Sequence, residues 1–259
     1  MHNPELKEKI KFVVGIICGG LKSKYYTDYL AQEAGCKSEY SHAQYRVKNE
    51  KSYALDYKFS CEEKLNKKIH MVEMRSLGDM WGTGLFKSNA CDFCDDVVTE
   101  LADISLGDAW IDPYDKSGLG NSIIITRTKI AETIIQNGLN QNFLTLDKVT
   151  KEKILLSQSG SFNHRQKGLL YRMQYYNKCG KAFPEKRQRL LEKQNIFFNL
   201  VQKSRLKTRQ KSLDIWIDTK SIENFRKEIQ PYLKQLKVLT KLSHKYSRVM
   251  QILNKVLVK

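Results

Sequence analysis

The sequence has no long uninterrupted apolar run. Its 259 residues are 41% hydrophobic, enough to build a core, but the stretch of about eighteen apolar residues that a membrane-spanning helix needs is missing. The opening residues, MHNPELKEKIKF, lack the basic-then-apolar layout of a signal peptide. Internal repeats and low-complexity tracts are also missing. We therefore expect a cytoplasmic protein with one sizeable domain, or one domain and an appendage.

The sequence also lacks the second metal-binding motif that usually accompanies a first one. Cys91 and Cys94 form a C-x-x-C motif, and two thiolates at this spacing can bind one metal centre. A zinc site usually adds a second C-x-x-C or a paired His motif, and neither is present. The six cysteines are Cys18, Cys36, Cys61, Cys91, Cys94 and Cys179. In a reducing compartment this set favours metal or redox chemistry over a disulfide framework.

Cys18 is the natural third ligand beside Cys91 and Cys94. It follows a β-branched apolar run, residues 10–17, and precedes two glycines that would let a bulky cofactor approach the backbone. From spacing alone, an ordinary buried cysteine is an equally good interpretation. An iron–sulfur cluster normally takes four thiolates, so either Cys61 completes the set or the fourth ligand comes from a segment outside this chain.

The pattern along the chain predicts an α/β fold, with an α+β mixed sheet and flanking helices, followed by a basic helical C-terminal region. Strands are predicted at residues 10–17, 53–60, 68–74, 103–108 and 121–128. A helix capped by Ser23 and stopped by Gly35 follows the first strand. A short amphipathic helix is expected at residues 129–138, and further helices follow Pro184, with interruptions near 211–221 and at Pro231.

Positive charge is concentrated near the C-terminus. From Pro184 onward there are nineteen Lys or Arg against six Asp or Glu, a net charge of +13, whereas the first 183 residues have 26 against 22, a net charge of +4. Apolar residues between Leu233 and Val256 trace an imperfect helical stripe with lysines around it. Two interpretations stay open here: a helix packed on its own body, or a basic amphipathic surface for anionic lipid or an acidic partner, which would make the protein peripheral to the membrane.

The order of the motifs resembles one protein family, the C-terminal domain of the β subunit of coenzyme F-420 hydrogenases and dehydrogenases. The resemblance covers roughly residues 11–165. After Cys18-Gly19 and before Cys91 comes YRVKN, in which Arg46 and Lys48 match the family pattern. After the C-x-x-C come ADISLGDAW and GLGNSIIITRT, whose matching residues are Asp103, Gly107, Asp108, Trp110, Gly120, Ser122 and Thr128.

The resemblance implies an iron–sulfur flavoprotein oxidoreductase that binds FAD and a 4Fe-4S cluster. Members pass electrons between a partner and a small-molecule acceptor such as a deazaflavin, and related bacterial members occur beside polysaccharide biosynthesis genes. Cys18, Cys91 and Cys94 would be cluster ligands. The residues expected to contact a cofactor are Gly19, Gly20, Lys22, Ser23, Arg46, Lys48, Gly107, Asp108 and Ser122.

Several of these cofactor residues also have a structural interpretation. Gly19 to Ser23 start a helix, where free backbone N–H groups favour an anion or need a cap. Arg46 and Lys48 would offset cofactor charge, or are solvated strand residues. Asp108 is expected to orient a loop through backbone hydrogen bonds, since a flavin does its own hydride chemistry.

The chain departs from the family in what precedes the first strand. Typical members have an upstream G-T-P-C-Q cysteine and often a ferredoxin-like domain, and neither is found in this sequence. We expect two domains, residues 1–165 and a helical extension, residues 166–259. A ferredoxin-like domain or subunit is the expected partner. The alternative function is a non-catalytic remnant or partner subunit of a split enzyme. Few aromatics lie among the C-terminal lysines, which argues against nucleic acid as the partner.

Overall fold

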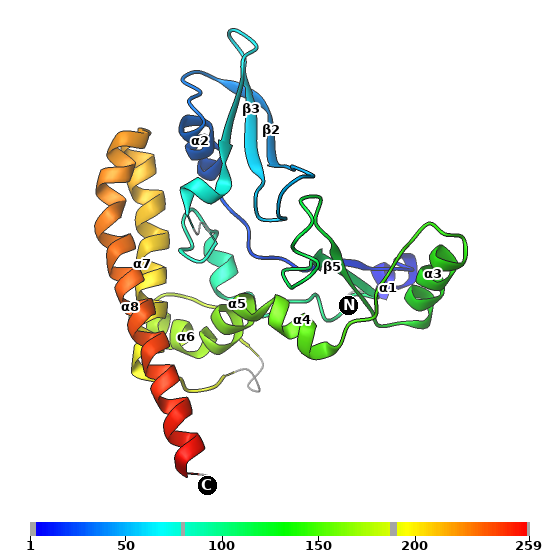
Figure 1. Cartoon of the computed structure of the whole chain (residues 1–259). Coiled ribbons are helices and arrows are strands. Elements are labelled where there is room, and N and C mark those ends of the chain that lie inside the picture. Colours follow the sequence, from blue (N-terminus) through cyan, green and yellow to red (C-terminus); the bar gives the residue numbers. More distant parts are fainter. Residues whose placement is uncertain (1–3, 79–80, 187–190, 258–259) are drawn as a thin grey trace. The chain divides into compact units, whose positions relative to one another are not determined.

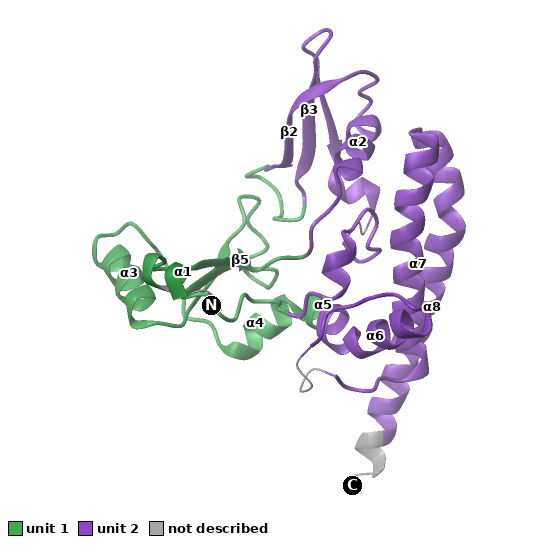
Figure 2. Cartoon of the chain, turned by 180° about the vertical axis from the view of Figure 1, so that it is seen from behind, with its two compact units in different colours: residues 1–19, 49–55, 96–162 green, residues 20–48, 56–95, 163–259 purple. Residues whose placement is uncertain are grey.

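The computed structural model describes residues 4–78, 81–186 and 191–257 (Figure 1). The chain forms two compact units, each made of segments that are far apart in sequence (Figure 2). Unit 1 comprises residues 1–19, 49–55 and 96–162, and unit 2 comprises residues 20–48, 56–95 and 163–259. The predicted boundary at residue 165 falls near the last of these divisions, and the two-domain assignment itself stays a prediction.

Unit 1 contains a three-stranded mixed sheet in the order β1-β5-β6. Its strands are β1 (Val14–Ile16), β5 (Ile104–Asp108) and β6 (Ser122–Thr126). β1 runs parallel to β5, and β5 runs antiparallel to β6. The helices of this unit are α1 (Pro4–Lys9), α3 (Lys129–Asn140), α4 (Lys151–Ser157) and α5 (Ser159–Ser161).

The two faces of this sheet differ in burial. Ile17 and Ile123 pack with Ala109 on one face and form the small core of unit 1. Gly107 permits this packing, because a Cβ at that position would lie 2.4 Å from the Cβ of Ile17. On the opposite face Val14 and Ile16 are 56% and 71% exposed. β1 is shorter than the strand predicted at residues 10–17. Its own side chains are mostly outside the core.

Unit 2 contains an antiparallel sheet in the order β2-β3-β4, with α2 packed against it (Figure 1). These elements are β2 (Tyr40–Val47), β3 (Lys58–Glu63), β4 (Ile69–Glu73) and α2 (Lys24–Glu33). The core is aromatic: Phe86 stacks on Phe225 at 5.1 Å between ring centroids, and the edge of Trp216 meets Phe86 at 5.8 Å. Burial of such large rings stabilises this unit.

The remaining elements of unit 2 are short turns and long helices. They are η1 (Met74–Leu77), η2 (Asn89–Asp92), η3 (Phe162–Lys167), which begins one residue before unit 2, α6 (Leu169–Lys178), α7 (Ile196–Thr219) and α8 (Ile222–Leu257). α7 and α8 lie side by side along much of their length (Figures 1 and 2). Lys220, in the left-handed conformation with φ 48°, separates them.

The predicted fold class is confirmed, with several local differences. The strand predicted at residues 53–60 begins only at Lys58, as β3. β2 was not predicted, because its residues YSHAQYRV are mostly polar and only half-buried. Instead of the predicted interruption near residues 211–221, α7 continues to Thr219 and α8 begins at Ile222. The interruption at Pro231 was wrong: this proline lies inside α8, which continues past it. Within the described residues, no helix has both the length and the apolar character required to cross a membrane.

Candidate functional site

The C-x-x-C motif lies on an irregular loop of unit 2, where backbone and side-chain donors reach both sulfur atoms. Cys91 belongs to η2, and Cys94 follows it. The Leu21 backbone N–H donates to Cys91 Sγ at 3.1 Å, and Arg165 Nη2 donates to Cys94 Sγ at 2.6 Å. Both cysteines are half-buried. Hydrogen bonds to sulfur of this kind also surround the thiolate ligands of metal centres.

The glycine-rich segment before α2 pairs with the segment that leads into the cysteine loop. Ser23 N donates to Phe86 O at 2.8 Å, and Ser88 N donates to Leu21 O at 2.8 Å. This short ladder places Leu21 N beside Cys91. The ladder brings together two segments that are about 70 residues apart in sequence. The predicted residues Gly20, Lys22 and Ser23 lie on the segment that contacts the cysteine loop.

Gly20 is needed because a lysine side chain lies against it. A Cβ at Gly20 would lie 2.8 Å from Lys87 Cε, and its φ of +133° is a conformation that other residues rarely adopt. The Lys87 side chain is 8% exposed. The glycine therefore lets this lysine extend past the backbone into the cavity beside Cys91.

Two buried arginines hold the cysteine loop in place. Arg172 donates to Asp92 O at 2.6 Å, to His164 O at 2.5 Å and to Arg165 O at 2.9 Å. Arg209 forms an ion pair with Asp92, with 2.7 Å between Nε and Oδ2. A guanidinium group offers five donors in a fixed plane, which suits this clamping of several carbonyl groups at once.

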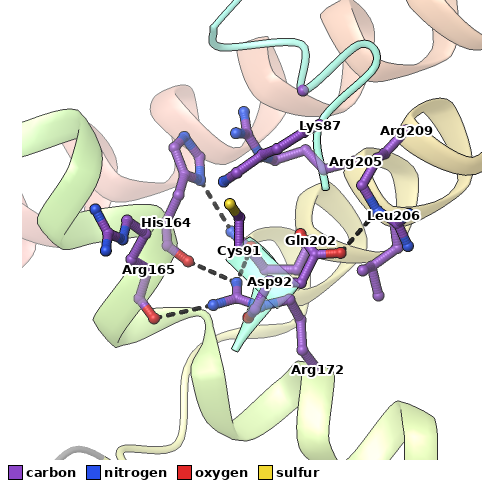
Figure 3. Close-up of a pocket in the computed structure, with 11 residues that line it drawn as sticks. Lys87, Cys91, Asp92, His164, Arg165, Arg172, Gln202, Arg205, Leu206 and Arg209 are labelled. Carbon is purple, nitrogen blue, oxygen red and sulfur yellow. Dashed lines mark hydrogen bonds and ion pairs between the residues drawn. The ribbon is translucent and has the colours of Figure 1, made fainter. Parts of the chain in front are cut away.

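The cavity beside Cys91 is strongly cationic (Figure 3). Among the described residues, its charged lining comprises the acidic Asp92 and five basic side chains, those of Lys87, Arg165, Arg172, Arg205 and Arg209. Figure 3 shows Lys87, His164 and Cys91 pointing into the same space. An excess of buried positive charge is costly unless an anion balances it. The arrangement therefore favours an anionic group at the cysteine pair.

Burial and mutual repulsion shift the cationic groups in the expected direction. Burial lowers the pKa of Lys87, and the negative groups Asp92 and Cys91 oppose that shift. Burial, followed by Arg205 and Arg172, lowers the pKa of His164 well below its ordinary value, so this histidine is neutral at physiological pH. Burial lowers the pKa of Arg172 to about 10. An added anion would reverse each of these shifts.

The other predicted residues divide between the two units. Cys18 follows β1 and is exposed, and it belongs to unit 1, as do Gly19, Gly107, Asp108 and Ser122. Asp108 and Ser122 are opposite each other in the β5–β6 pair. The meeting of Cys18 with Cys91 and Cys94 therefore stays a prediction.

Several predicted cofactor residues already have protein partners. Lys22 Nζ donates to Leu85 O at 2.5 Å and lies over the ring of Trp81, and the Arg46 guanidinium lies over the ring of Tyr57. The Ser23 side chain makes no capping hydrogen bond to α2. Lys48 lies just beyond β2 and is exposed. The Asp108 backbone carbonyl accepts from Gln158 Nε2 at 3.1 Å, and the loop-orienting role expected for Asp108 stays a prediction.

The basic residues that line the cavity were not predicted from the sequence. Arg172, Arg205 and Arg209 lie in the region that was expected to be a helical extension. One signal was available: Gln202, Arg205 and Arg209 recur at helical spacing, so they share one face of α7.

A family profile described as the C terminus of the coenzyme F420 hydrogenase/dehydrogenase beta subunit matches residues 1–152, which is more than half of the chain. The chain belongs to this family. The matched part of this F-420 hydrogenase/dehydrogenase β-subunit domain includes Cys18, Cys91 and Cys94 but ends before Arg165. The arginines of η3, α6 and α7 are thus an addition from outside the matched region. No curated protein matches the chain in sequence.

Proposed function

We propose that this F-420 hydrogenase/dehydrogenase β-subunit domain is an oxidoreductase module in which Cys91 and Cys94, with Cys18, hold a 4Fe-4S cluster. The observation that supports the proposal most is the cationic cavity beside Cys91. A cluster bound by thiolates is an anion, and Lys87 and the arginines would offset its charge. The cluster would supply one-electron transfer, which FAD would couple to hydride exchange with a small-molecule acceptor.

The protein groups around the pair have separate tasks. Leu21 N and Arg165 would stabilise the sulfur atoms by N–H···S hydrogen bonds, which raise the reduction potential of a cluster. Arg172 and Arg209 would keep the loop in its ligating shape through Asp92. Lys87 would favour the more negative, reduced state.

The start of α2 fits a flavin phosphate less well. The Lys22 ammonium and the Ser23 backbone N–H already donate to Leu85 O and Phe86 O. FAD is therefore an expectation from the family, as is the link to polysaccharide biosynthesis.

A ferredoxin-like domain or subunit is the partner that would complete the site. Val14, Ile16 and Leu106 form an exposed aliphatic face of unit 1, and β1, which contributes the first two, ends shortly before Cys18. Exposed apolar patches of this kind favour protein contacts. Such a partner would supply the fourth thiolate, and the alternative of a non-catalytic subunit predicts that no cluster forms with or without it.

Anaerobic reconstitution of the full chain with iron, sulfide and a small thiol, which can take the place of the fourth thiolate, tests the proposal. We expect brown protein with about four irons and about four sulfides per chain. Cys91→Ser and Cys94→Ser should lose most of the iron, whereas Cys179→Ser, at an exposed cysteine, should keep it. Colourless protein, or equal iron in Cys91→Ser and Cys179→Ser, would overturn the assignment.

A second role, attachment to anionic membranes, is supported by α8. Seven Lys or Arg and no acidic residue follow Glu228. On the same helix Val238, Val249, Ile252 and Leu253 are 55%, 46%, 62% and 47% exposed. Aliphatic side chains flanked by lysines are typical of a helix lying in a lipid interface, whereas nucleic-acid grooves need charge and stacking rings.

Cosedimentation with vesicles tests the membrane role. We expect binding to vesicles containing phosphatidylglycerol and little binding to pure phosphatidylcholine. Leu253→Asp should reduce binding severalfold, and Leu65→Asp, at a leucine 85% exposed in the β3–β4 turn, should not. Equal reduction by both variants, or tighter binding to duplex DNA than to the acidic vesicles, would reject it.

A further inference from the structure

A second group of metal-ligand side chains lies on one face of the β2-β3-β4 sheet. Cys61 and Glu63 are two residues apart on β3, so both side chains point to the same face. His70 on β4 is directly opposite Cys61 in the antiparallel register. Side chains paired in this way have Cβ atoms about 5 Å apart. All three residues are buried, at 1%, 8% and 9% exposure.

Cys36 covers this face from the turn that follows α2. Gly35, with a φ of +89°, directs the chain back toward the sheet, and Cys36 is 3% exposed. Cys36 Sγ, a carboxylate oxygen of Glu63 and a ring nitrogen of His70 lie within 4.8 Å of one another. Cys61 lies beside this group, because it is paired with His70 in the sheet register. Four ligand-type side chains from three separate segments therefore meet in one buried place.

The Glu63 carboxylate is held in position by groups around it. Ser38 Oγ and Lys37 N donate to Oε1 at 2.9 Å and 3.3 Å, and Asn66 Nδ2 donates to Oε2 at 2.9 Å. His70 Nε2 lies 3.2 Å from the same Oε2. Outer hydrogen bonds of this kind orient the carboxylate ligands of metal sites.

We propose that Cys36, Cys61, Glu63 and His70 bind a structural Zn²⁺ ion. Thiolate, imidazole and carboxylate are the ligand types of zinc, and four protein ligands with no access for water are typical of a structural site. Zinc–ligand bonds of about 2.0–2.3 Å need ligand atoms about 3.3–3.8 Å apart. The ligand atoms of Cys36, Glu63 and His70 lie within 4.8 Å of one another, so they must move closer together to bind one ion. Both thiols release their protons on binding, and His70 binds as the neutral imidazole.

This inference is independent of the proposed cluster site, because the two sets share no residue. The Cys36 group contains a carboxylate and lies in the aromatic core of unit 2, whereas Cys91 and Cys94 lie beside arginines. A divalent cation suits the first surroundings and an anionic cluster suits the second. Iron binding at one site and zinc binding at the other can therefore be tested, and rejected, separately.

Zinc binding by the full chain tests the inference. The background is the Cys91→Ser, Cys94→Ser double variant, which removes the other thiol pair. Protein stripped by chelator under reducing conditions receives Zn²⁺ alone, and we expect about one ion per chain and a higher melting temperature. In this background Cys61→Ser and His70→Gln should reduce bound zinc to near zero. His244→Gln, at an exposed histidine on α8, is the matched control.

Cobalt provides a readout that does not depend on stability. Co²⁺ in place of Zn²⁺ should give the absorption of a tetrahedral thiolate site, and Cys61→Ser should weaken its charge-transfer band. The inference is overturned if folded double-variant protein, judged by circular dichroism, retains no zinc. A Cys36–Cys61 disulfide in freshly prepared protein would overturn it too.

Discussion

The two cysteine groups of unit 2 lie in opposite surroundings. Cys91 and Cys94 are half-buried on an irregular loop among arginines, with Asp92 as the acidic residue of the cavity lining. Cys36, in the turn after α2, and Cys61, on β3, are buried beside Glu63 and His70. The two cysteine pairs are therefore suited to different metal groups. Positive surroundings favour an anionic cluster, and a carboxylate with an imidazole favours a metal cation.

The largest loss of stability is expected when the arginine that holds the cysteine loop is removed. Arg172→Met would leave the carbonyl oxygens of Asp92, His164 and Arg165 without a buried donor. We expect a loss of about 3–5 kcal/mol in the free energy of unfolding. Urea denaturation of the metal-free protein measures it.

The matched control is a surface arginine. Arg75 pairs with Asp56, and their side chains are 64% and 24% exposed, so Arg75→Met should cost only about 0–1 kcal/mol. Equal losses in the two variants would show that Arg172 has no special structural role.

The second test concerns the close approach of Lys87 to the backbone. Gly20→Ala adds a Cβ that would lie 2.8 Å from Lys87 Cε and forces an unfavourable φ, so we expect a cost of about 1–3 kcal/mol. Gly78→Ala also has a positive φ but has open space around the new methyl group. It should therefore cost less in the same urea experiment.

A double variant separates contact from backbone strain. If the Lys87 side chain is the obstacle, adding Lys87→Ala to Gly20→Ala should recover part of the lost stability. Strictly additive losses would mean that the contact does not matter and that only the backbone conformation does.

The smallest expected effect is on the electron-transfer property itself. Lys87→Met removes a buried positive charge beside Cys91, which should lower the cluster potential by roughly 40–90 mV, about 1–2 kcal/mol for one electron at an effective dielectric constant near 20. A redox titration monitored by electron paramagnetic resonance measures the shift. Lys178→Met, at an exposed lysine on α6, should leave the potential unchanged.

Local patterns predicted much of the fold. The run NSIIITRT and the amphipathic KIAETIIQNG became β6 and α3, because each contains its own periodicity and, for α3, a cap at Thr128. Tyr40–Val47 escaped prediction because its pairing with β3, and not its composition, makes it a strand. Pro231 is tolerated because α8 packs along α7, where tertiary contact outweighs local preference.

Only part of the candidate site could be predicted from the sequence. The spacing of Cys91 and Cys94 indicates a metal site, since both ligands lie on one loop. Nothing in the composition distinguishes the buried Arg172 and Arg209 from the many solvated basic residues around them. Only the packing of α6 and α7 against the cysteine loop selects them.

Measuring iron and zinc in the same anaerobic preparations tests the central claim, that the two cysteine groups are chemically distinct. The Cys91→Ser, Cys94→Ser protein should lose iron and keep about one zinc, and Cys36→Ser should lose zinc and keep its iron. Loss of both metals from both variants, at unchanged circular dichroism, would contradict the claim.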